Sequence, residues 1–407
     1  MRQVLSLTKK FSLVVFFNLA AIILMLAALE FAASFFVSKP SDVIVGDLIV
    51  NHTWRPNARF IHDEWVANNP DFPEPYVHRT NRQGWLENYD VEVAKPANTY
   101  RIFYVGDSFT EGTAPMDQSV PSLVETRLNA IAENGRWRYE VINTGTTSYS
   151  PTIYYLLVRY VLMKYSPDLI VVNVDMTDDF DDWKYSQTLV RDKSGDPLAA
   201  PPRDIYSAPF IDTETETIKS SWWLRAQIYL FENSYTYNFM RKLSTKVIRK
   251  LGLGPEGNSN PISLTESGAR YERWEWCSRE WEGQVLANAR HTLDLLKRLA
   301  LWLKHREVKL MLTSVPHYPQ YASKEDGTGK PKWTSRPHKE IARISAENEV
   351  PYLDSFRALA GVIRGTPQTE FYYSGDMHFN PRGYAVWADA HFEFLSDPKN
   401  GLLPTEN

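Results

Sequence analysis

Apolar residues along the chain form two kinds of pattern, one continuous and one periodic. The continuous run covers residues 11–29 (FSLVVFFNLAAIILMLAAL), whose only polar members are Ser12 and Asn18. A helix needs about 20 apolar residues to span the hydrocarbon core of a bilayer. From residue 100 onward the apolar runs are short and recur between turn residues, which is typical of a folded domain.

Five short apolar runs predict strands, and amphipathic stretches between them predict helices. The predicted strands are 101–105, 139–142, 168–174, 308–315 and 350–353. The predicted helices are 117–134, 151–165, 284–306, 339–349 and 381–395. The third strand, DLIVVNV, is apolar on both faces, as expected inside a parallel sheet. This alternation of strands and helices predicts an α/β domain with a parallel sheet.

The alternation is interrupted between residues 183 and 283. This stretch holds a Pro-Pro loop, aromatic helical segments and a Gly-, Asn- and Ser-rich segment at 252–260. Because the α/β rhythm resumes afterwards, we interpret it as an insertion in one domain of residues 99–400. Residues 38–98 are rich in Pro, Asn and Asp and show little periodicity. We interpret them as a juxtamembrane segment that lies over that domain.

Charges beside the continuous apolar run favour a membrane anchor over residues 11–37. Arg2, Lys9 and Lys10 precede the run, and the next basic residue is Lys39. Positive charge marks the cytoplasmic flank of a membrane helix. A cleaved signal peptide is an alternative, although its apolar region is shorter and ends at small residues. A buried core helix is the other alternative.

The anchor interpretation implies a topology for the whole chain. Residues 1–10 are then cytoplasmic, and the domain after residue 37 lies outside the cell membrane, in the periplasm if the source is Gram-negative. Glu30 would lie near the outer interface, where a carboxylate is tolerated.

Composition narrows the class of protein. Of 407 residues, 43% are hydrophobic and 23% charged, which suffices for a sizeable core and excludes global disorder. The formal net charge is −4, and no basic block indicates nucleic acid as a partner. Cys277 is the single cysteine, which excludes an intrachain disulfide framework and a cysteine-based zinc cluster. We expect it to be a buried free thiol.

A serine follows the first predicted strand at a tight turn. The strand RIFYV runs into Gly106-Asp107-Ser108, and Thr110 and Gly112 follow. Reactive groups collect at the carboxyl ends of strands in parallel sheets. The alternative is that Ser108 merely caps the next helix.

An acid and a histidine precede the last predicted helix. Asp376 and His378 stand two residues apart in the sequence SGDMHFNP, so an extended loop can project both to one side. A serine nucleophile needs a base, and the base needs an acid that orients its ring. Taken alone, Asp376 could equally be a helix cap and His378 a surface histidine.

Together these two segments resemble the SGNH or GDSL-type esterase superfamily. The resemblance rests on Gly106-Asp107-Ser108 with Thr110 and Gly112, and on Asp376-Met377-His378-Phe379-Asn380-Pro381-x-Gly383, in that order. Asn81-x-x-Gly84 and Thr99-Tyr100-Arg101 look like membrane-anchored members. The resemblance covers about 99–182 and 307–395.

The resemblance implies a three-layer α/β/α flavodoxin-like fold and a serine hydrolase that uses no cofactor and no metal. It implies Ser108 as the nucleophile, His378 as the general base and Asp376 as the acid that orients the histidine.

In two further sequence motifs, the second and third blocks of the family, this chain differs from the family's usual residues. The second usually offers a glycine N–H to the oxyanion; in NTGTTSYS that position falls on Ser148, with Gly145 as the other candidate. The third usually offers an asparagine amide, and here Asp178 stands in its place unless Asn173 is the counterpart. An ionised carboxylate cannot donate to an oxyanion. Asp178 is therefore protonated, replaced by another donor, or used otherwise, for example as a helix cap.

Other candidate sites have weaker support. An acidic cluster could bind Ca²⁺, but it lacks the glycine and the terminal glutamate of an EF-hand loop. We therefore favour the interpretation that these acidic residues lie at the N-terminus of a helix. His317 follows the fourth predicted strand and could face the site, although we favour a loop histidine without a role. Tryptophans in the insertion could form a glycan platform or the insertion's own core, which we favour. The acidic cluster is Asp175, Asp178, Asp179, Asp181 and Asp182, and the tryptophans are Trp222, Trp223, Trp274, Trp276 and Trp281.

We therefore expect a membrane-anchored esterase or deacylase that acts through an acyl-Ser108 intermediate on an ester outside the cell membrane, with an O-acylated carbohydrate as substrate. An O-acetyltransferase would use the same triad and a sugar hydroxyl in place of water. A non-catalytic glycan-binding or scaffold protein on this fold is the second alternative, supported by Asp178 and by the missing glycine of the second block.

Overall fold

The computed structural model describes residues 2–37, 43–62, 75–132, 135–202, 211–212, 217–218, 222–250, 273–278, 280–322 and 333–404. Contacts divide the chain into two compact units. One unit combines residues 1–46 with 218–259, and the other combines 47–217 with 260–407. Part of the expected insertion therefore groups with the N-terminal helix. The Gly-, Asn- and Ser-rich segment 252–260 lies outside the described residues.

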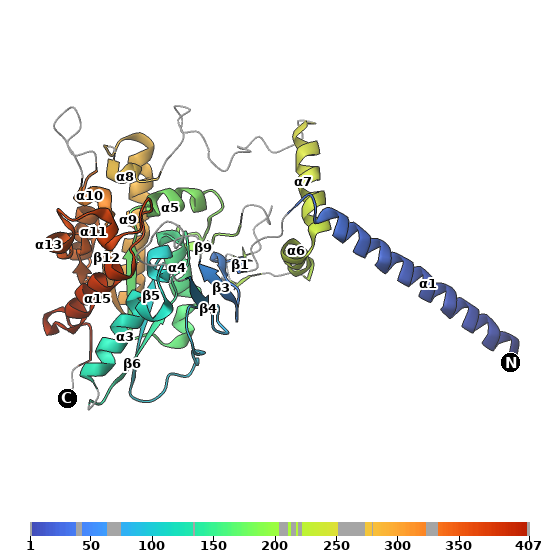
Figure 1. Cartoon of the computed structure of the whole chain (residues 1–407), viewed down its shortest axis with the longest axis horizontal. Coiled ribbons are helices and arrows are strands. Elements are labelled where there is room, and N and C mark those ends of the chain that lie inside the picture. Colours follow the sequence, from blue (N-terminus) through green and yellow to red (C-terminus); the bar gives the residue numbers. More distant parts are fainter. Residues whose placement is uncertain are drawn as a thin grey trace. The chain divides into compact units, whose positions relative to one another are not determined.

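Five parallel strands form the central sheet of the larger unit, which confirms the predicted α/β class (Figure 1). They are β5 (Thr99–Val105), β6 (Arg138–Asn143), β7 (Leu169–Val174), β12 (Lys309–Ser314) and β13 (Tyr352–Leu353). Their order is β6-β5-β7-β12-β13, which is the flavodoxin-like order. Because β5 pairs with both β6 and β7, the order reverses at β5, and ligand sites of such sheets lie at that reversal.

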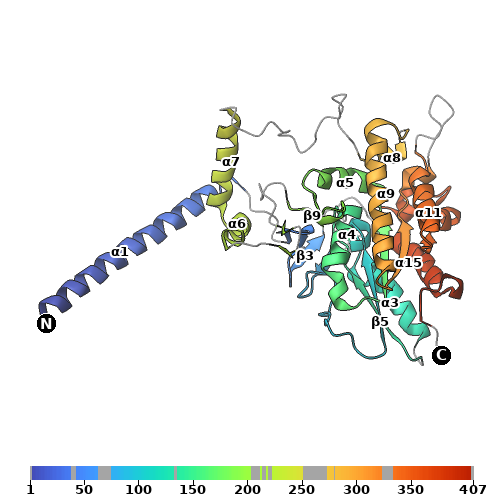
Figure 2. The same ribbon diagram turned by 180° about the vertical axis from the view of Figure 1, so that it is seen from behind.

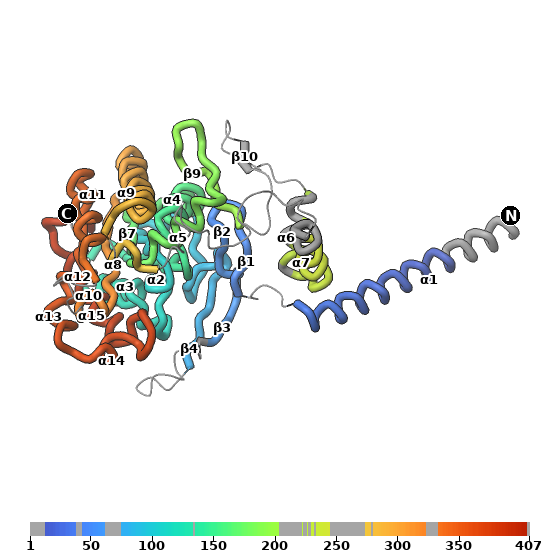
Figure 3. Tube along the Cα trace, turned by 90° about the horizontal axis from the view of Figure 1, so that it is seen from above, coloured from blue at the N-terminus to red at the C-terminus, as the bar shows by residue number. Residues whose placement is uncertain are grey.

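Helices cover both faces of this sheet and produce three layers. Phe103 and Val105 of β5 face one core cluster, and Ile102 and Tyr104 face the other. Seen from above in Figure 3, α4, α9 and α11 lie on one side of β7, and α3 and α15 lie on the other. These helices are α3 (Val120–Ile131), α4 (Pro151–Tyr160), α9 (Gly283–Lys304), α11 (Arg336–Glu347) and α15 (Pro381–Ser396).

Outside these three layers and the helices of the smaller unit, the described elements are short. The helical ones are α2 (Ser108–Glu111), η2 (Met116–Gln118), η3 (Leu162–Tyr165), α5 (Asp178–Ser186), α8 (Glu275–Ser278), α10 (Tyr318–Tyr321), α12 (Ser355–Ala358), α13 (Ala360–Ile363), α14 (Gln368–Phe371) and η4 (Pro398–Asn400). The strands are β1 (Ile44–Asp47), β2 (Asn51–Trp54), β3 (Arg59–His62), β4 (Tyr76–Arg79), β8 (Val190–Arg191), β9 (Pro197–Ala199), β10 (Ile211–Asp212) and β11 (Thr217–Ile218). β3 pairs with β4, and β8 with β9, both antiparallel.

The smaller unit consists of α1 (Arg2–Ala33), α6 (Trp222–Asn233) and α7 (Tyr235–Lys250), which Figure 2 shows from behind. Residues Leu13–Ala33 of α1 are long and apolar enough to cross a bilayer, and none of the most apolar window is buried inside the structure. An N-terminal helix of this kind is compatible with a membrane span or with a signal sequence.

A completely buried arginine ties β5 to its neighbours. Nε of Arg101 donates to Oε2 of Glu140 on β6 at 2.8 Å. Nη1 donates to the backbone carbonyls of Glu92 and Tyr165 at 3.0 and 2.6 Å. Removing one member of a buried ion pair leaves the other charge without compensation in a poorly solvated place. The network therefore contributes to the placement of the strand that precedes Ser108.

We predict that Arg101→Ala lowers the free energy of unfolding by about 3–5 kcal/mol, because Glu140 then stays buried without its partner. Arg343→Ala is the matched control, because Arg343 is exposed and pairs with Glu340 and Glu347 on the surface of α11. Its expected cost is within about 0.5 kcal/mol. Urea denaturation of the full chain in detergent measures both, and equal losses would contradict the assignment.

Candidate active site

Ser108 is the first residue of the short helix α2, directly after β5. Oδ1 of Asp107 accepts the backbone N–H of Phe109 at 2.9 Å and so caps this helix. The Ser108 side chain is half-buried. The backbone N–H of Ser108 has no acceptor among the described residues, as expected for the first turn of a helix.

Glycine at position 106 allows β5, α2 and β7 to meet closely. A Cβ there would lie 2.0 Å from Oγ1 of Thr110 and 3.2 Å from Cβ of Asn173. Nδ2 of Asn173 donates to that same Oγ1 at 2.7 Å. Asn173 is therefore a buried link between β7 and α2, and one of its two amide N–H groups is engaged by Thr110.

The loop before α15 is held by its own signature residues. Asn380 accepts the backbone N–H of Gly383 at 3.0 Å, which caps α15, and its Nδ2 donates to the carbonyl of Thr369 at 3.0 Å. A Cβ on Gly383 would lie 2.1 Å from the carbonyl oxygen of Phe371. The Asn380-Pro381-x-Gly383 pattern therefore fastens this loop to α14.

This anchoring brings Ser108, His378 and Asp376 into one chain of hydrogen bonds. Oγ of Ser108 lies 2.7 Å from Nε2 of His378, across 270 residues of sequence. Nδ1 of His378 lies 2.5 Å from Oδ1 of Asp376, which also accepts the backbone N–H of His378 at 2.8 Å. With its proton on Nδ1, the imidazole presents Nε2 as an acceptor to the serine hydroxyl.

The carboxyl group of Asp376 is suited to stabilise a charged imidazole. Partial burial raises its pKa, but the hydrogen bonds and charge of His378 outweigh this and hold the pKa of Asp376 below its ordinary value. The group is therefore ionised at neutral pH, and its negative charge is placed to stabilise the imidazolium that a proton transfer from Ser108 would produce.

Ser148 lies in the loop after β6 and has a left-handed backbone, with φ of 60°. For a residue other than glycine this conformation costs about 1–2 kcal/mol. Its backbone N–H has no acceptor among the described residues. The N–H of Gly145, by contrast, donates to Oδ1 of Asn143 at 3.0 Å, so of the two expected donors the structure leaves only that of Ser148 unoccupied.

Aromatic side chains from outside the sheet hold this loop. Tyr185 donates its hydroxyl to the carbonyl of Ser148 at 2.6 Å, and Nε2 of His52 donates to that of Thr147 at 2.9 Å. Nε1 of Trp54 donates to the carbonyl of Gly145 at 3.2 Å. Residues 51–54 and α5 thus fix the backbone around Ser148 in advance, which is what a preorganised donor requires.

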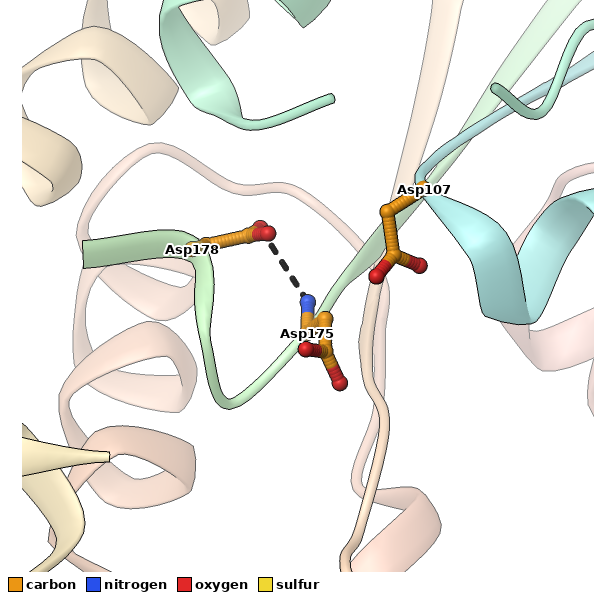
Figure 4. A group of neighbouring side chains, drawn as sticks. All are labelled: Asp107, Asp175 and Asp178. Carbon is orange, nitrogen blue, oxygen red and sulfur yellow. Dashed lines mark hydrogen bonds between the residues drawn. The ribbon is translucent and has the colours of Figure 1, made fainter. Parts of the chain in front are cut away.

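Asp178 is completely buried at the start of α5 and makes contacts other than those expected of an oxyanion donor. Its Oδ2 accepts the backbone N–H of Asp175 at 3.1 Å (Figure 4), and its Oδ1 accepts the hydroxyl of Tyr154 at 3.3 Å. The described residues show no hydrogen bond between Asp178 and Ser108. Burial, followed by the nearby charges of Asp107 and Asp175, raises the pKa of Asp178 well above its ordinary value.

Three carboxyl groups meet near the turn that carries Ser108. Oxygens of Asp107, Asp175 and Asp178 lie within 4.8 Å of one another, and Figure 4 shows them converging from the segments after β5 and β7. Burial and the charge of Asp175 raise the pKa of Asp107 well above its ordinary value. Like charges this close and this buried cannot all be ionised, so the cluster holds protons at neutral pH.

His317 determines which member of the cluster keeps its charge. Its Nδ1 accepts the indole N–H of Trp274 at 2.9 Å, so its proton is on Nε2, which donates to Oδ1 of Asp175 at 2.6 Å. Thr177 donates two further hydrogen bonds to Asp175. Burial would raise the pKa of Asp175, but His317 and then Thr177 hold it below its ordinary value.

The structure places His317 at the site, which was the less favoured of its two sequence-based interpretations. The ring of Phe109 lies between two histidines, with centroids 5.2 Å from His317 and 4.8 Å from His378. The one available signal was position, because His317 follows the fourth predicted strand by two residues. Its partners Asp175 and Trp274 come from distant segments, so sequence spacing could not identify them.

The carboxyl cluster offers a metal ion few unoccupied oxygens. Ca²⁺ takes six to eight oxygen ligands. Here the oxygens of Asp175 accept from His317 and Thr177, and those of Asp178 accept from Asp175 and Tyr154. A metal ion would displace these bonds. Asp182 accepts the hydroxyl of Ser150 and the N–H of Thr152 instead and so caps α4.

The tryptophans of the expected insertion divide between core and surface. Trp276 and Trp281 are buried, and their rings stack 6.3 Å apart against α9, as the core interpretation requires. Trp274 is half-buried, and its ring lies 5.5 Å from that of Trp333. Trp222 is exposed on α6. Cys277 is a buried free thiol.

Comparisons with known proteins give similarities of limited extent. No model of a protein family matches the chain, and no curated protein matches it. A catalytic mutant of Axe2, an acetylxylan esterase from Geobacillus stearothermophilus, has a TM-score of 0.41 and 11% identity, covering 74% of this chain and 97% of that one. LAE5, an alpha/beta hydrolase from the metagenome of Lake Arreo, Spain, has a TM-score of 0.38 and 12% identity, covering 76% and 98%. A two-domain esterase active on acetylated mannans has a TM-score of 0.38 and 11% identity, covering 74% and 50%.

We predict that Asp178→Asn makes folding less sensitive to rising pH. The raised pKa means that folded protein keeps a proton that the unfolded chain releases above its ordinary pKa of about 4. The stability from this group is therefore full below pH 4 and is lost as the pH rises towards the raised folded value. The asparagine still accepts the N–H of Asp175 and removes this loss, so the Tm difference, variant minus wild type, should grow from pH 4 to pH 8.

Differential scanning calorimetry at both pH values measures this difference. Asp117→Asn changes an exposed carboxylate in the same way and is the matched control, with a difference that should not grow. A difference for Asp178→Asn that stays flat or shrinks would show that the group is ionised in the folded protein.

Proposed function

We propose that the protein is a membrane-anchored serine ester hydrolase of the SGNH type. The observation that carries the proposal is the continuous hydrogen bonding from Asp376 through His378 to Ser108, at the point of the sheet where the strand order reverses. Nucleophile, base and orienting acid are the parts that acyl transfer requires.

The reaction follows from this geometry. Nε2 of His378 removes the proton of Ser108 as Oγ attacks the ester carbonyl, and Asp376 stabilises the resulting imidazolium. The free backbone N–H groups of Ser108 and Ser148 are our candidates for the oxyanion donors. His378 then protonates the leaving alcohol. Water attacks the acyl-Ser108 ester while His378 takes its proton, and His378 returns this proton to Oγ of Ser108 as the carboxylic acid leaves.

The carboxyl cluster supports this chemistry by limiting negative charge. Asp107 adjoins Ser108, and an ionised carboxylate there would oppose the developing oxyanion. Burial and the charge of Asp175 raise the pKa of Asp107, which favours the neutral form of its carboxyl group. The charge stays on Asp175, where the hydrogen bond from Nε2 of His317 stabilises it.

An O-acylated carbohydrate is the substrate that we propose. Trp274 and Trp333 are half-buried, and the ring of Trp274 lies 6.0 Å from that of His317, at the carboxyl edge of the sheet. Indole faces stack on the apolar faces of sugar rings. Trp274 has φ of 65°, a strained conformation for a bulky residue, and its bond to His317 fixes the ring.

We predict that Ser108→Ala lowers p-nitrophenyl acetate hydrolysis by about 10⁴-fold to 10⁶-fold with the fold intact. His378→Ala should cost about as much, and the double variant little more, because the two groups act as a unit. Ser374→Ala is the matched control, since it removes the hydroxyl of an exposed serine in the loop that carries the base. Near-full activity of Ser108→Ala would overturn the proposal.

The same assay with an added sugar acceptor separates hydrolysis from acyl transfer. Release of p-nitrophenol without acceptor supports the hydrolase. Release that requires the acceptor, with an acetylated sugar as product, would identify an O-acetyltransferase with the same triad. No release under either condition would favour a non-catalytic carbohydrate-binding protein.

We propose that α1 anchors this domain outside the cell membrane. The charge asymmetry around the apolar run and the absence of buried residues from its most apolar window support the proposal.

We predict that a reporter active only after export is active when it is fused after Asn407, and that a reporter active only in the cytoplasm is silent there. Moving basic charge from Arg2, Lys9 and Lys10 to the other side of the run should reverse the two signals. Activity of the cytoplasmic reporter on the unaltered protein would contradict the proposed topology.

A further inference from the structure

A pair of helices packs on the C-terminal end of α1. α6 and α7 are joined at Ser234, and within the smaller unit α7 runs across the end of α1 instead of continuing it (Figures 1 and 2). The rings of Phe36 and Phe239 lie 5.8 Å apart, and Ala33 and Val37 are buried. These contacts hold the helix pair to the last turns of α1.

Glu30 of α1 fastens α7 through hydrogen bonds. Its carboxylate accepts the hydroxyl of Ser234 at 2.9 Å and the backbone N–H groups of Tyr235 and Thr236, the latter at 3.1 Å. The carboxylate thus occupies the place of an N-cap, with the favourable orientation of negative charge at a helix N-terminus. α7 therefore begins at the level of Glu30, at the end of the candidate span.

Large apolar side chains of this unit are exposed to a degree that a water-facing helix pair rarely shows. Trp222 and Tyr229 on α6 are 77% and 66% exposed, and Met240 and Leu243 on α7 are 56% and 45% exposed. Tryptophan and tyrosine are enriched at the interface between bilayer and water, where their rings have both an apolar and a polar neighbour.

The charge of α7 has one sign. Its sequence, YTYNFMRKLSTKVIRK, contains five basic residues and no acidic residue. Lys242 is exposed, and Arg241 packs its guanidinium over the ring of Phe231 at 4.9 Å. A basic amphipathic helix with aromatic residues is the type that lies in the headgroup region of anionic membranes.

We propose that α6 and α7 form an interfacial hairpin that lies on an anionic bilayer surface at the outer end of α1. The proposal rests on the membrane anchoring proposed above and adds a second contact with the lipid. Glu30 sets the depth of the hairpin, the exposed aromatic and aliphatic side chains enter the acyl boundary, and the exposed Lys242 meets lipid phosphates.

The test measures lipid contact at single labelled cysteines in the full chain. Cys277→Ala removes the native thiol, and an NBD fluorophore is attached to Leu243→Cys, Tyr229→Cys, Leu24→Cys or Ile131→Cys. Leu24 reports the span, and Ile131 is an exposed control on α3. The proteins are reconstituted into phosphatidylcholine vesicles with or without about one third phosphatidylglycerol, with lipids brominated at shallow or deep acyl positions.

We expect shallow bromines to quench the labels at Leu243 and Tyr229 by at least twofold, with stronger quenching when phosphatidylglycerol is present. Deep bromines should quench the label at Leu24, and neither should quench the label at Ile131. Lys242→Glu should lower quenching at Tyr229 in anionic vesicles, whereas the same charge change at exposed Lys339 on α11 should not.

Each outcome decides a separate statement. Unquenched labels at Leu243 and Tyr229 beside a quenched label at Leu24 would overturn the hairpin and leave the anchor standing. An unquenched label at Leu24 would overturn both. Quenching that is equal with and without phosphatidylglycerol would overturn the anionic surface as the partner.

Discussion

The candidate site depends on the close approach of the segments that follow β5, β6 and β7. Two glycines permit this approach. A Cβ on Gly106 would collide with Thr110, and a Cβ on Gly145 would lie 2.2 Å from the backbone nitrogen of Glu111. Because these segments touch, the N–H of Ser108 and the loop of Ser148 sit beside the same short helix. The second glycine thus serves packing, and Ser148 adopts the left-handed backbone instead.

The candidate site also contains buried carboxyl groups whose charges must be accommodated. Three carboxyl groups lie within 4.8 Å, and the structure accommodates them by leaving the charge on one and raising the pKa of two. Hydrogen bonds from His317 and Thr177 select Asp175 as the charged member. The negative charge therefore lies on Asp175 and not on Asp107, the residue next to the proposed nucleophile. His317, which donates to Asp175, is itself oriented by its hydrogen bond with Trp274.

In each unit an acidic side chain accepts hydrogen bonds from the N–H groups at the start of a helix. Asp107 caps α2 from the adjacent residue, whereas Glu30 caps α7 from another helix altogether. In the first case the cap exposes a serine at the edge of the sheet. In the second it places an aromatic and basic helix at the end of an apolar one. Both use the unpaired N–H groups that every helix start presents.

Hydrophobic periodicity determined the five strands and the helices between them, because burial on one or both faces leaves a local record in the sequence. The order of Ser108 and of Asp376 with His378 likewise indicated a triad, since each group lies beside a recognisable element boundary. Three features came only from the tertiary structure. His317 meets Asp175 across 142 residues, the N–H of Gly145 turns out to be engaged, and residues 218–259 group with α1 through Glu30. Each of these features depends on which groups the folded chain brings into contact. The spacing of residues along the sequence does not predict such contacts.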